Sequence, residues 1–248
     1  MNIGLMWSKF WEKFADREIV GADGVVRISE GAWRRVVGEG LVNTVLIAVV
    51  GLLMGIVLGT LIAAVRVMPK YKRLPRILDK VCSVYVGFFR GTPIVVQLLM
   101  TYYVIFPLCG INIGSLATCM LVFGLNSGAY VSEIMRSGIQ SVDAGQLEAG
   151  RAVGLPYRTA MMKIVIPQSI KNILPTLGNE FIVLIKDTSV VSFVAAVDLY
   201  KTFTEIGNKT YEYLIPYFVM ALIYIVLVAL ISVGVKMMER RFKRSERA

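Results

Sequence analysis

The chain has no histidine among its 248 residues and only three cysteines. Metal sites and acid–base or nucleophilic mechanisms that depend on an imidazole are therefore excluded. Cys82, Cys109 and Cys119 are well separated and lie in apolar surroundings, so we expect small buried side chains rather than a disulfide framework or a metal cluster. The chain also lacks a Gly-Lys-Ser/Thr phosphate loop. If ATP drives this protein, another subunit must bind it.

Acidic residues are outnumbered, because 17 Asp and Glu stand against 27 Lys and Arg and leave a net charge of +10. Taken alone, such a balance suits nucleic acid or an anionic surface. However, 56% of the residues are hydrophobic and the mean hydropathy is +0.66, which is too apolar for an ordinary soluble domain. Since the charges gather at the ends of apolar segments, the sequence predicts an integral membrane protein that contacts lipid and no nucleic acid.

Five apolar segments predict the transmembrane helices of an all-α membrane protein. A span needs about 20 residues, and the segments cover residues 41–65, 81–106, 114–135, 169–197 and 214–235. In the first segment Gly51, Gly55 and Gly59 recur every four residues. This spacing lets another helix approach closely, and we interpret it as packing inside the protein. The chain then divides into an N-terminal part, residues 1–40, and a transmembrane domain, residues 41–248.

The first twenty residues predict an amphipathic helix. Aromatic residues follow the helical spacing i, i+3, i+4 and i+7, and charged residues occupy the other face. The aromatic residues are Trp7, Phe10, Trp11 and Phe14. Such a helix either lies on the membrane surface or packs against the protein's own spans, and the sequence leaves both open. We expect residues 21–40 to form a polar connector and residues 198–213 to form a polar loop.

The stretch from Glu148 to Pro167 is a polar island between apolar segments. Its first five residues include good helix formers, and Gly154 suits a left-handed helix end. Pro156 then stands where a proline can open the next helix. This pattern predicts a helix, a sharp stop and a second helix.

The spacing in this stretch resembles the cytoplasmic signature loop of ABC importer permeases. In that loop Glu-Ala-Ala is followed by Gly six residues after the Glu and by Ile-x-Leu-Pro further on. The matching positions are Glu148, Ala149, Gly154, Ile164 and Pro167, and the departures are Gly150 and Ile166. The resemblance implies a coupling loop over residues 137–168 whose short helix docks on a separate ATPase, through Glu148, Ala149, Gly150, Gly154, Leu155 and Pro167. The alternative is an ordinary solvated helical hairpin between two spans.

Other stretches look like the polar amino acid branch of that family, which includes histidine, glutamine and arginine permeases. They are Phe89 to Pro93 followed by Gln97, Gly128 to Tyr130, Glu133, Arg136 to Gly138 and Lys186 to Ser189. The resemblance implies a type I importer fold with five spans and a cytoplasmic coupling helix. It also implies a second permease subunit, of the same or a homologous chain, and an extracytoplasmic amino-acid-binding protein. ATP and Mg²⁺ would bind to the partner ATPase, so this chain itself is expected to hold no cofactor and to be no enzyme.

The second apolar segment is interrupted by Arg90-Gly91-Thr92-Pro93. An arginine within a span is costly when it faces lipid, so Arg90 should face protein or water. Gly91 and Pro93 should loosen the helix at the same place. The alternative for Arg90 is a helix kink at which a backbone carbonyl satisfies the guanidinium.

A solute inside the membrane needs polar partners, and the spans offer several. Our candidates for the substrate pathway are Arg90, Thr92, Gln97, Asn126, Glu133, Lys186, Asp187, Thr188 and Ser189. For Glu133 an ion pair with Arg136 is the competing interpretation. For Lys186 and Asp187 the competing interpretation is an internal salt bridge between helices.

The distribution of basic residues predicts the topology. Lys and Arg number six in residues 66–80, five in 136–171 and six in 236–248, against six in 1–40 and two in 198–213. Five spans put the termini on opposite sides. The positive-inside rule therefore places the signature loop and the C-terminus in the cytoplasm, and the N-terminus outside. The family resemblance implies that the membrane is a bacterial inner membrane.

Two other classes of function remain at this point. An ion-coupled secondary transporter or channel would need no ATPase, and a membrane enzyme or scaffold would need no pathway. The identity of the amino acid is equally open. Acidic residues in the spans suit a basic substrate, whereas Lys186 suits an acidic one.

Overall fold

The computed structural model describes residues 3–15, 17–20, 26–29, 31–69, 71 and 73–244. The elements, in chain order, are α1 (Ile3–Phe14), β1 (Arg17–Val20), β2 (Val26–Ser29), α2 (Ala32–Arg35), η1 (Val36–Leu41), α3 (Val42–Val67), α4 (Arg73–Gly91), α5 (Ile94–Met100), η2 (Thr101–Ile105), α6 (Phe106–Leu108), α7 (Ser115–Gln140), α8 (Ala144–Ala152), α9 (Tyr157–Ala160), η3 (Met161–Val165), α10 (Ile166–Asp187), η4 (Thr188–Val194), α11 (Leu199–Thr210) and α12 (Leu214–Arg244). The fold is that of a helical membrane protein. Two short antiparallel strands, β1 and β2, are the departure from the predicted all-α class.

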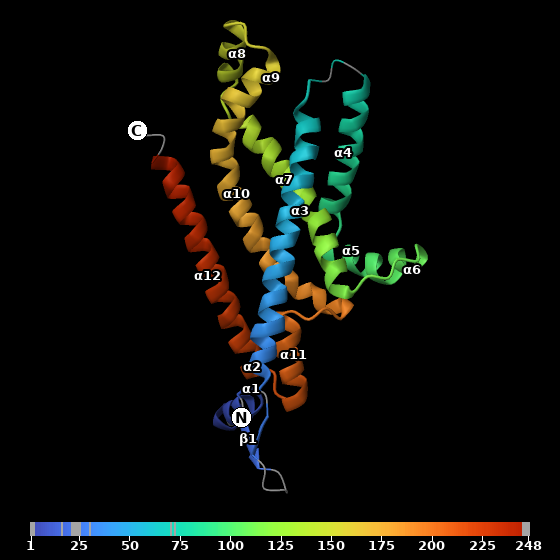
Figure 1. Cartoon of the computed structure of the whole chain (residues 1–248), viewed down its shortest axis with the longest axis vertical. Helices are drawn as coiled ribbons and strands as arrows, with labels where there is room; N and C mark the ends of the chain where they lie inside the picture. Colours follow the sequence, from blue (N-terminus) through green and yellow to red (C-terminus); the bar gives the residue numbers. More distant parts are fainter. Residues whose placement is uncertain are drawn as a thin grey trace.

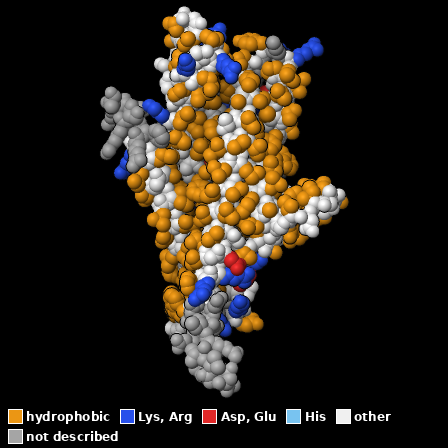
Figure 2. Space-filling model, viewed as in Figure 1, with side chains coloured by type: hydrophobic (Ala, Val, Ile, Leu, Met, Phe, Trp, Pro, Cys, Tyr) orange, Lys and Arg blue, Asp and Glu red, His pale blue; other side chains and the backbone are white. Residues whose placement is uncertain are grey.

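The long helices run between two ends of the molecule (Figure 1). We call them the α8 end, which also holds α9 and the connection from α3 to α4, and the α11 end, which also holds α1. The helix α3 leads to the α8 end, α4 returns, α7 leads back and α10 returns again, while α12 rises from the α11 end toward the C-terminus. In Figure 2 hydrophobic side chains cover the middle of the visible face, and Lys and Arg gather toward its ends.

The pair α3 and α7 forms the centre of the bundle, and glycines bring the two backbones close together. A Cβ atom added at Gly55 would stand 2.5 Å from the Ser127 hydroxyl oxygen, and one added at Gly59 would stand 2.7 Å from Val131. These distances leave no room for a side chain. The predicted packing role of the glycine stripe is therefore confirmed.

Three helical stretches are long and apolar enough to cross a membrane: residues 32–67, 115–140 and 214–240. The helices α4 and α5–α6 qualify only as a pair, and they are bent by 103° at the break between Gly91 and Ile94. Among the described residues this gives three candidate spans, or four if the bent pair is one span. The predicted count of five is not reached, because α10 carries too many polar residues.

Several boundaries differ from the sequence-based expectations. The first apolar helix is continuous with α2 and η1 and begins at Ala32, and α4 already begins at Arg73. The expected loop over residues 198–213 is largely the helix α11. The Asp198 side chain caps this helix by accepting bonds from the backbone N–H groups of Tyr200 and Lys201, at 3.1 and 2.9 Å. Polar composition thus concealed an amphipathic helix with a buried apolar face.

The N-terminal helix α1 packs against α11 and α12. Met6 and Phe10 are buried, and the ring of Phe14 stacks on that of Phe203 with centroids 6.4 Å apart. Trp11 remains exposed on the other side. Of the two interpretations left open by the sequence, packing against the protein's own helices therefore holds for one face. The cysteines also differ from expectation, since Cys119 is buried but Cys109 is exposed.

We predict that Gly55→Ala destabilises the protein by about 1–3 kcal/mol, because the new methyl group overpacks the contact between α3 and α7. Thermal unfolding in detergent measures the change. Gly234→Ala on α12 is the matched control, since nothing lies within 4 Å of a Cβ at that position. There the gain in helix propensity should leave stability unchanged or slightly higher. Equal thermal midpoints for the two variants would contradict the importance of this contact.

Candidate functional site

The break between α4 and α5 exposes a backbone carbonyl that the helix cannot satisfy. Pro93 has no N–H to donate to the Phe89 carbonyl oxygen, which lies four residues earlier. The Gln97 side-chain amide donates to that oxygen instead at 2.9 Å, and to the Thr92 carbonyl oxygen at 3.0 Å. Asn126 on α7 donates to the Phe89 oxygen at 3.3 Å and to the Gln97 side-chain oxygen at 3.0 Å. Three predicted pathway residues thus hold the broken helix against α7.

Arg90 points away from this network and toward the acidic side chain of Glu133. Its guanidinium lies 4.0 Å from the Glu133 carboxylate and 5.5 Å from the centre of the Tyr130 ring. Arg66 and Arg136 also pair with Glu133, the latter at 2.7 Å. The predicted pair of Glu133 and Arg136 is therefore present within a larger cluster. One carboxylate is shared among three arginines, so it does not fully neutralise any of them.

A polar cavity of about 400 Å³ lies beside the break. Its polar lining comes from the α4–α5 break, from α7 and from α10. These polar or charged residues are Arg90, Thr92, Asn126, Tyr130, Glu180 and Asp187. The structure therefore brings together four predicted pathway residues from three different helices. We call this space the polar cavity.

The remaining candidates lie elsewhere. Lys186 and Ser189 line a second space of about 600 Å³ between the end of α10 and α12, together with Tyr200 and Tyr224. Thr188 is fully buried, and its hydroxyl donates to the Ile185 carbonyl oxygen at 2.8 Å. Although Lys186, Asp187, Thr188 and Ser189 are consecutive, the helix turns them to different sides.

Glu180 is the charged residue of the polar cavity that the sequence analysis did not select. It is 9% exposed, and its carboxylate accepts a bond from the Ser127 hydroxyl at 3.2 Å. The signal that could have found it is spacing, because positions 180 and 187 are seven residues apart and share one face of a helix.

The helix α8 contains the coupling candidates and has well-defined ends. Asp143 caps its beginning by accepting a bond from the Gly145 N–H at 2.6 Å. At the other end the Leu155 N–H donates to the Gly150 carbonyl oxygen at 3.1 Å and the Gly154 N–H donates to Arg151 at 3.0 Å. With Gly154 at φ +89°, this is a Schellman motif. The predicted helix, stop and second helix are all present.

One face of α8 packs against the protein, and the other face is exposed. Gly150 is buried, and a Cβ there would stand 2.7 Å from Ile164 and 3.3 Å from Ala160. Glu148 and Ala149 are exposed, as is the neighbouring turn. Pro167 lies in the first turn of α10, where a proline is tolerated. A methyl group at Gly150 would require the end of the Ile164 side chain to shift, so this face of α8 is closely packed.

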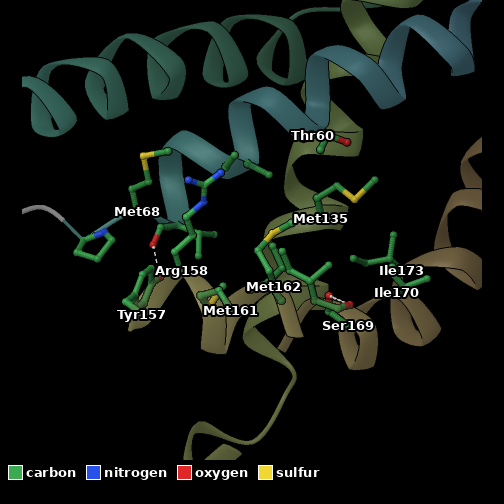
Figure 3. Close-up of a pocket in the computed structure, with 16 residues that line it drawn as sticks. Thr60, Met68, Met135, Tyr157, Arg158, Met161, Met162, Ser169, Ile170 and Ile173 are labelled. Atoms are coloured by element: carbon green, nitrogen blue, oxygen red, sulfur yellow. Dashed lines mark hydrogen bonds between the residues drawn. The ribbon is translucent and has the colours of Figure 1, made fainter. Parts of the chain in front are cut away.

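A third space, of about 610 Å³, lies between the ends of α3 and α7 and the segment α9–η3–α10 (Figure 3). Its lining is almost entirely apolar and includes four methionines, Met68, Met135, Met161 and Met162. Tyr157 borders it and donates to the Val67 carbonyl oxygen at 3.4 Å. Burial raises the pKa of this phenol, and the nearby Tyr71 adds to the shift. The flexible thioethers suit a contact that adjusts when helices move.

Comparison with known proteins places the chain among transport components. The family model described as binding-protein-dependent transport system inner membrane component matches residues 55–244. A putative glutamine transport system permease protein GlnP of Rickettsia bellii is 38% identical, over 82% of this chain and 91% of that protein. The arginine transport system permease protein ArtQ of Bacillus subtilis is 36% identical, over 84% and 93%. The L-cystine transport system permease protein TcyB of Bacillus subtilis is 35% identical, over 84% and 87%.

Solved structures of ABC transporters also contain chains that match this one. A crystal structure of an amino acid ABC transporter with histidines contains a chain 37% identical, with a TM-score of 0.78, covering 84% of this chain and 95% of that one. The MetNI methionine ABC transporter in an inward-facing conformation matches with a TM-score of 0.71 at 18% identity, covering 84% and 96%. At that identity the second likeness concerns the fold alone.

We predict that Gln97→Leu lowers stability by about 1–3 kcal/mol, because it removes the Gln97 donor from the Phe89 and Thr92 carbonyl oxygens and leaves Asn126 as the described side-chain donor to Phe89. The thermal unfolding midpoint in detergent reports the loss. Thr101→Val serves as the control, since among the described residues the Thr101 hydroxyl donates to the Gln97 carbonyl oxygen, one turn earlier in the same helical run. If both variants unfold at the temperature of the unchanged protein, the network does not hold the break.

Proposed function

The chain belongs to the family of binding-protein-dependent transport system inner membrane components, and on that premise we propose how it carries an amino acid. It is the permease component of an ABC importer for amino acids, a multi-pass protein of the inner membrane whose ATP is bound by a separate subunit. Such a system has an ATPase and a binding protein as partners.

We take α10 as a fifth span beside α3, the bent pair α4–α5, α7 and α12. Its 22 residues extend about 33 Å at 1.5 Å per residue, which is enough to cross the apolar core. It packs against α3, α7 and α12, so protein rather than lipid surrounds much of it. Its polar side chains also find partners, as when Asn172 donates to the Ser141 hydroxyl oxygen at 2.9 Å. This arrangement tolerates polar residues that lipid would not.

The α8 end is the cytoplasmic end in this proposal. The basic connection from α3 to α4 and the loop with α8 both lie there, and α12 leads toward it (Figure 1). The excess of Lys and Arg in these segments follows the positive-inside rule. The N-terminus and α11 then lie outside, where a binding protein delivers its cargo.

A second permease subunit completes the pathway. Arg90 lines the polar cavity, yet its side chain is 45% exposed in the single chain. An arginine so exposed at the level of the spans requires water or another protein surface beside it. A dimer, with itself or with a homologous chain, encloses this side of the cavity.

The exposed face of α8 is the main support for the proposal that this helix couples the permease to the ATPase. Glu148 and Ala149 are available to an ATPase, while Gly150 on the other face is in close contact with Ala160 and Ile164. From Tyr157 the helical backbone continues without interruption through η3 and α10 to Asp187. A displacement of α8 by the ATPase is therefore transmitted to α10, which carries Glu180 and Asp187 into the polar cavity. ATP binding and hydrolysis would thus alternate the access to that cavity.

The cargo pathway runs through the polar cavity. Arg90, Thr92 and Asn126 face the cargo from one side and Asp187 from another, while Gln97 and Glu133 hold Asn126 and Arg90 in place. Lys186 and Ser189 line a different space, so they lie outside the proposed cavity. Ligand sites in proteins combine apolar walls with few convergent polar groups, as this cavity does.

A mild-detergent pull-down from the native membrane should recover an ATP-hydrolysing subunit with the tagged permease. We predict that Gly154→Leu leaves this complex assembled but lowers ATP-dependent uptake at least about tenfold, because a left-handed residue with a side chain costs about 1–2 kcal/mol and displaces the end of α8. Adding Glu148→Ala should also weaken recovery of the ATPase.

Gly110→Leu is the matched control for Gly154→Leu. Gly110 also has a positive φ, +66°, and nothing lies within 4 Å of an added Cβ at either glycine. It lies in the turn before α7, far along the chain from α8, so its variant should retain uptake. Loss of uptake in both variants alike, or recovery of the permease without any ATPase, would refute the coupling proposal.

The topology predicts opposite labelling of two introduced cysteines. In a background with Cys109→Ala, Lys209→Cys at the end of α11 should react with a membrane-impermeant maleimide on intact cells. Val153→Cys beside α8, where the side chain is 78% exposed, should react only after the membrane is permeabilised. The reverse pattern would place the N-terminus in the cytoplasm.

A further inference from the structure

The apolar side of α1 is wider than the surface of the protein that covers it. Met6 and Phe10 are buried where α1 packs against α11 and α12. Ile3, Trp7 and Trp11 follow one another at intervals of four residues and form a second stripe along the helix, beside the buried one. Trp7 is partly buried, whereas Ile3 and Trp11 are 56% and 51% exposed. We call this stripe the tryptophan face.

The two flanks of the buried face differ in chemistry. Lys9 and Trp11 are the chain neighbours of Phe10, so each lies about 100° around the helix from it, in opposite directions. Both side chains are exposed. One flank of α1 therefore presents a charged ammonium group, which suits water, and the other presents an apolar ring.

The helix α1 lies beside the beginnings of α12 and of the helical run that leads into α3 (Figure 1). Its buried residues share an apolar cluster with Val36, just before α3, and with Ile215, in the first turn of α12. Glu39 and Glu212 are the last charged residues before these two helices enter their long charge-free runs. Because charge is costly within the hydrocarbon, the edge of the apolar core lies close to these residues. The helix α1 thus lies at the boundary between membrane and water.

The span on which α1 packs also has an uncovered apolar side. In α12, Leu214, Phe218 and Leu222 recur every four residues and are all exposed. A helix that crosses a membrane turns such a surface toward lipid. The tryptophan face of α1 therefore belongs to a region in which apolar side chains remain uncovered at the end of a span.

Tryptophan suits the headgroup layer, because its large ring is apolar while its indole N–H needs a polar partner. Within the described part of the chain, neither Trp7 nor Trp11 donates a hydrogen bond to a protein group. The two rings stack with centres 6.4 Å apart, and the rings of Phe10 and Phe14 each lie 5.5 Å from that of Trp11. Aromatic neighbours thus fix the Trp11 ring, while half of the side chain and its donor stay open.

We propose that α1 is an interfacial helix whose tryptophan face lies in the headgroup layer of the membrane at the α11 end. The buried face attaches α1 to the protein, and the flank with Lys9 faces water. Through the stacked rings of Phe14 and Phe203, α1 also holds α11 at this level. The partner of this surface is the lipid membrane, and the inference depends neither on the proposed cargo cavity nor on the proposed coupling contact.

The test is quenching of tryptophan fluorescence in the purified full-length chain, reconstituted into phosphatidylcholine vesicles. The chain has three tryptophans, so Trp33→Phe combined with Trp7→Phe leaves Trp11 as its single reporter. We expect phosphatidylcholine brominated near the headgroup end of its acyl chains to quench most of the Trp11 emission. Lipid brominated near the ends of the acyl chains, and iodide dissolved on both sides of the membrane, should quench it much less.

The matched control places the same reporter on the other flank of the same helix. In a chain whose three native tryptophans are replaced by phenylalanine, Lys9→Trp carries a ring toward water. Iodide should quench this reporter, and both brominated lipids should quench it much less. The contrast between the two reporters measures the orientation of α1, which nearness to the membrane alone would not produce.

Quenching of Trp11 by iodide but not by brominated lipid would overturn the inference, since the tryptophan face would then lie in water. Protection of Trp11 from every quencher would also overturn it, because another protein surface would then cover this face. Stronger quenching by the deep bromines, or equal lipid quenching of the two reporters, would contradict the proposed depth and orientation. If the reporter chains fail to fold, as judged by gel filtration, the difference in quenching between the unchanged protein and Trp11→Phe decides in the same way.

Discussion

The close contact between α3 and α7 is the constraint on which the rest of the structure depends. Within a membrane, apolar surface gains little by leaving lipid, so helices associate through packing and hydrogen bonds. Gly51, Gly55 and Gly59 let α7 approach until no side chain fits between the two backbones. The helices α4 and α10 then each pack against both members of this pair. Their positions, and the cavity between them, follow from how closely the central pair can come together.

Pro93 breaks the helix, and this single residue both leaves a carbonyl oxygen that needs a new donor and opens the polar cavity. Pro93 removes a backbone donor, and Gln97 and Asn126 provide the bonds that the Phe89 carbonyl oxygen would otherwise lack. An unpaired carbonyl at this depth is costly, because no lipid group can bond to it. The same break turns α5 aside by 103° and leaves Arg90 and Thr92 beside an open space. Stability of the fold and access for a polar solute therefore have a common origin.

The continuous helical run from Tyr157 to Asp187 joins the two functional regions in the proposed mechanism. Its beginning packs on α8, the proposed ATPase contact, and its second half brings Glu180 and Asp187 to the polar cavity. Near the beginning of this run, the methionine-lined space lies against the ends of α3 and α7. Flexible side chains there can repack while α3 and α7 remain in contact. The coupling thus requires movement of one element against a fixed pair, rather than deformation of the whole bundle.

The sequence by itself determined the membrane class, the family resemblance, the glycine contact and the helix–stop–helix around Gly154, because each rests on local composition or spacing. It did not reveal α11, since polar residues on one face of a helix resemble a loop when the cap at Asp198 is not recognised. Nor could it assign the consecutive residues Lys186 and Asp187 to different spaces, or unite Glu180 with Arg90. Those relations depend on how α10 is rotated and on which helices surround it. Only the tertiary structure decides them, because adjacent residues of a helix point about 100° apart.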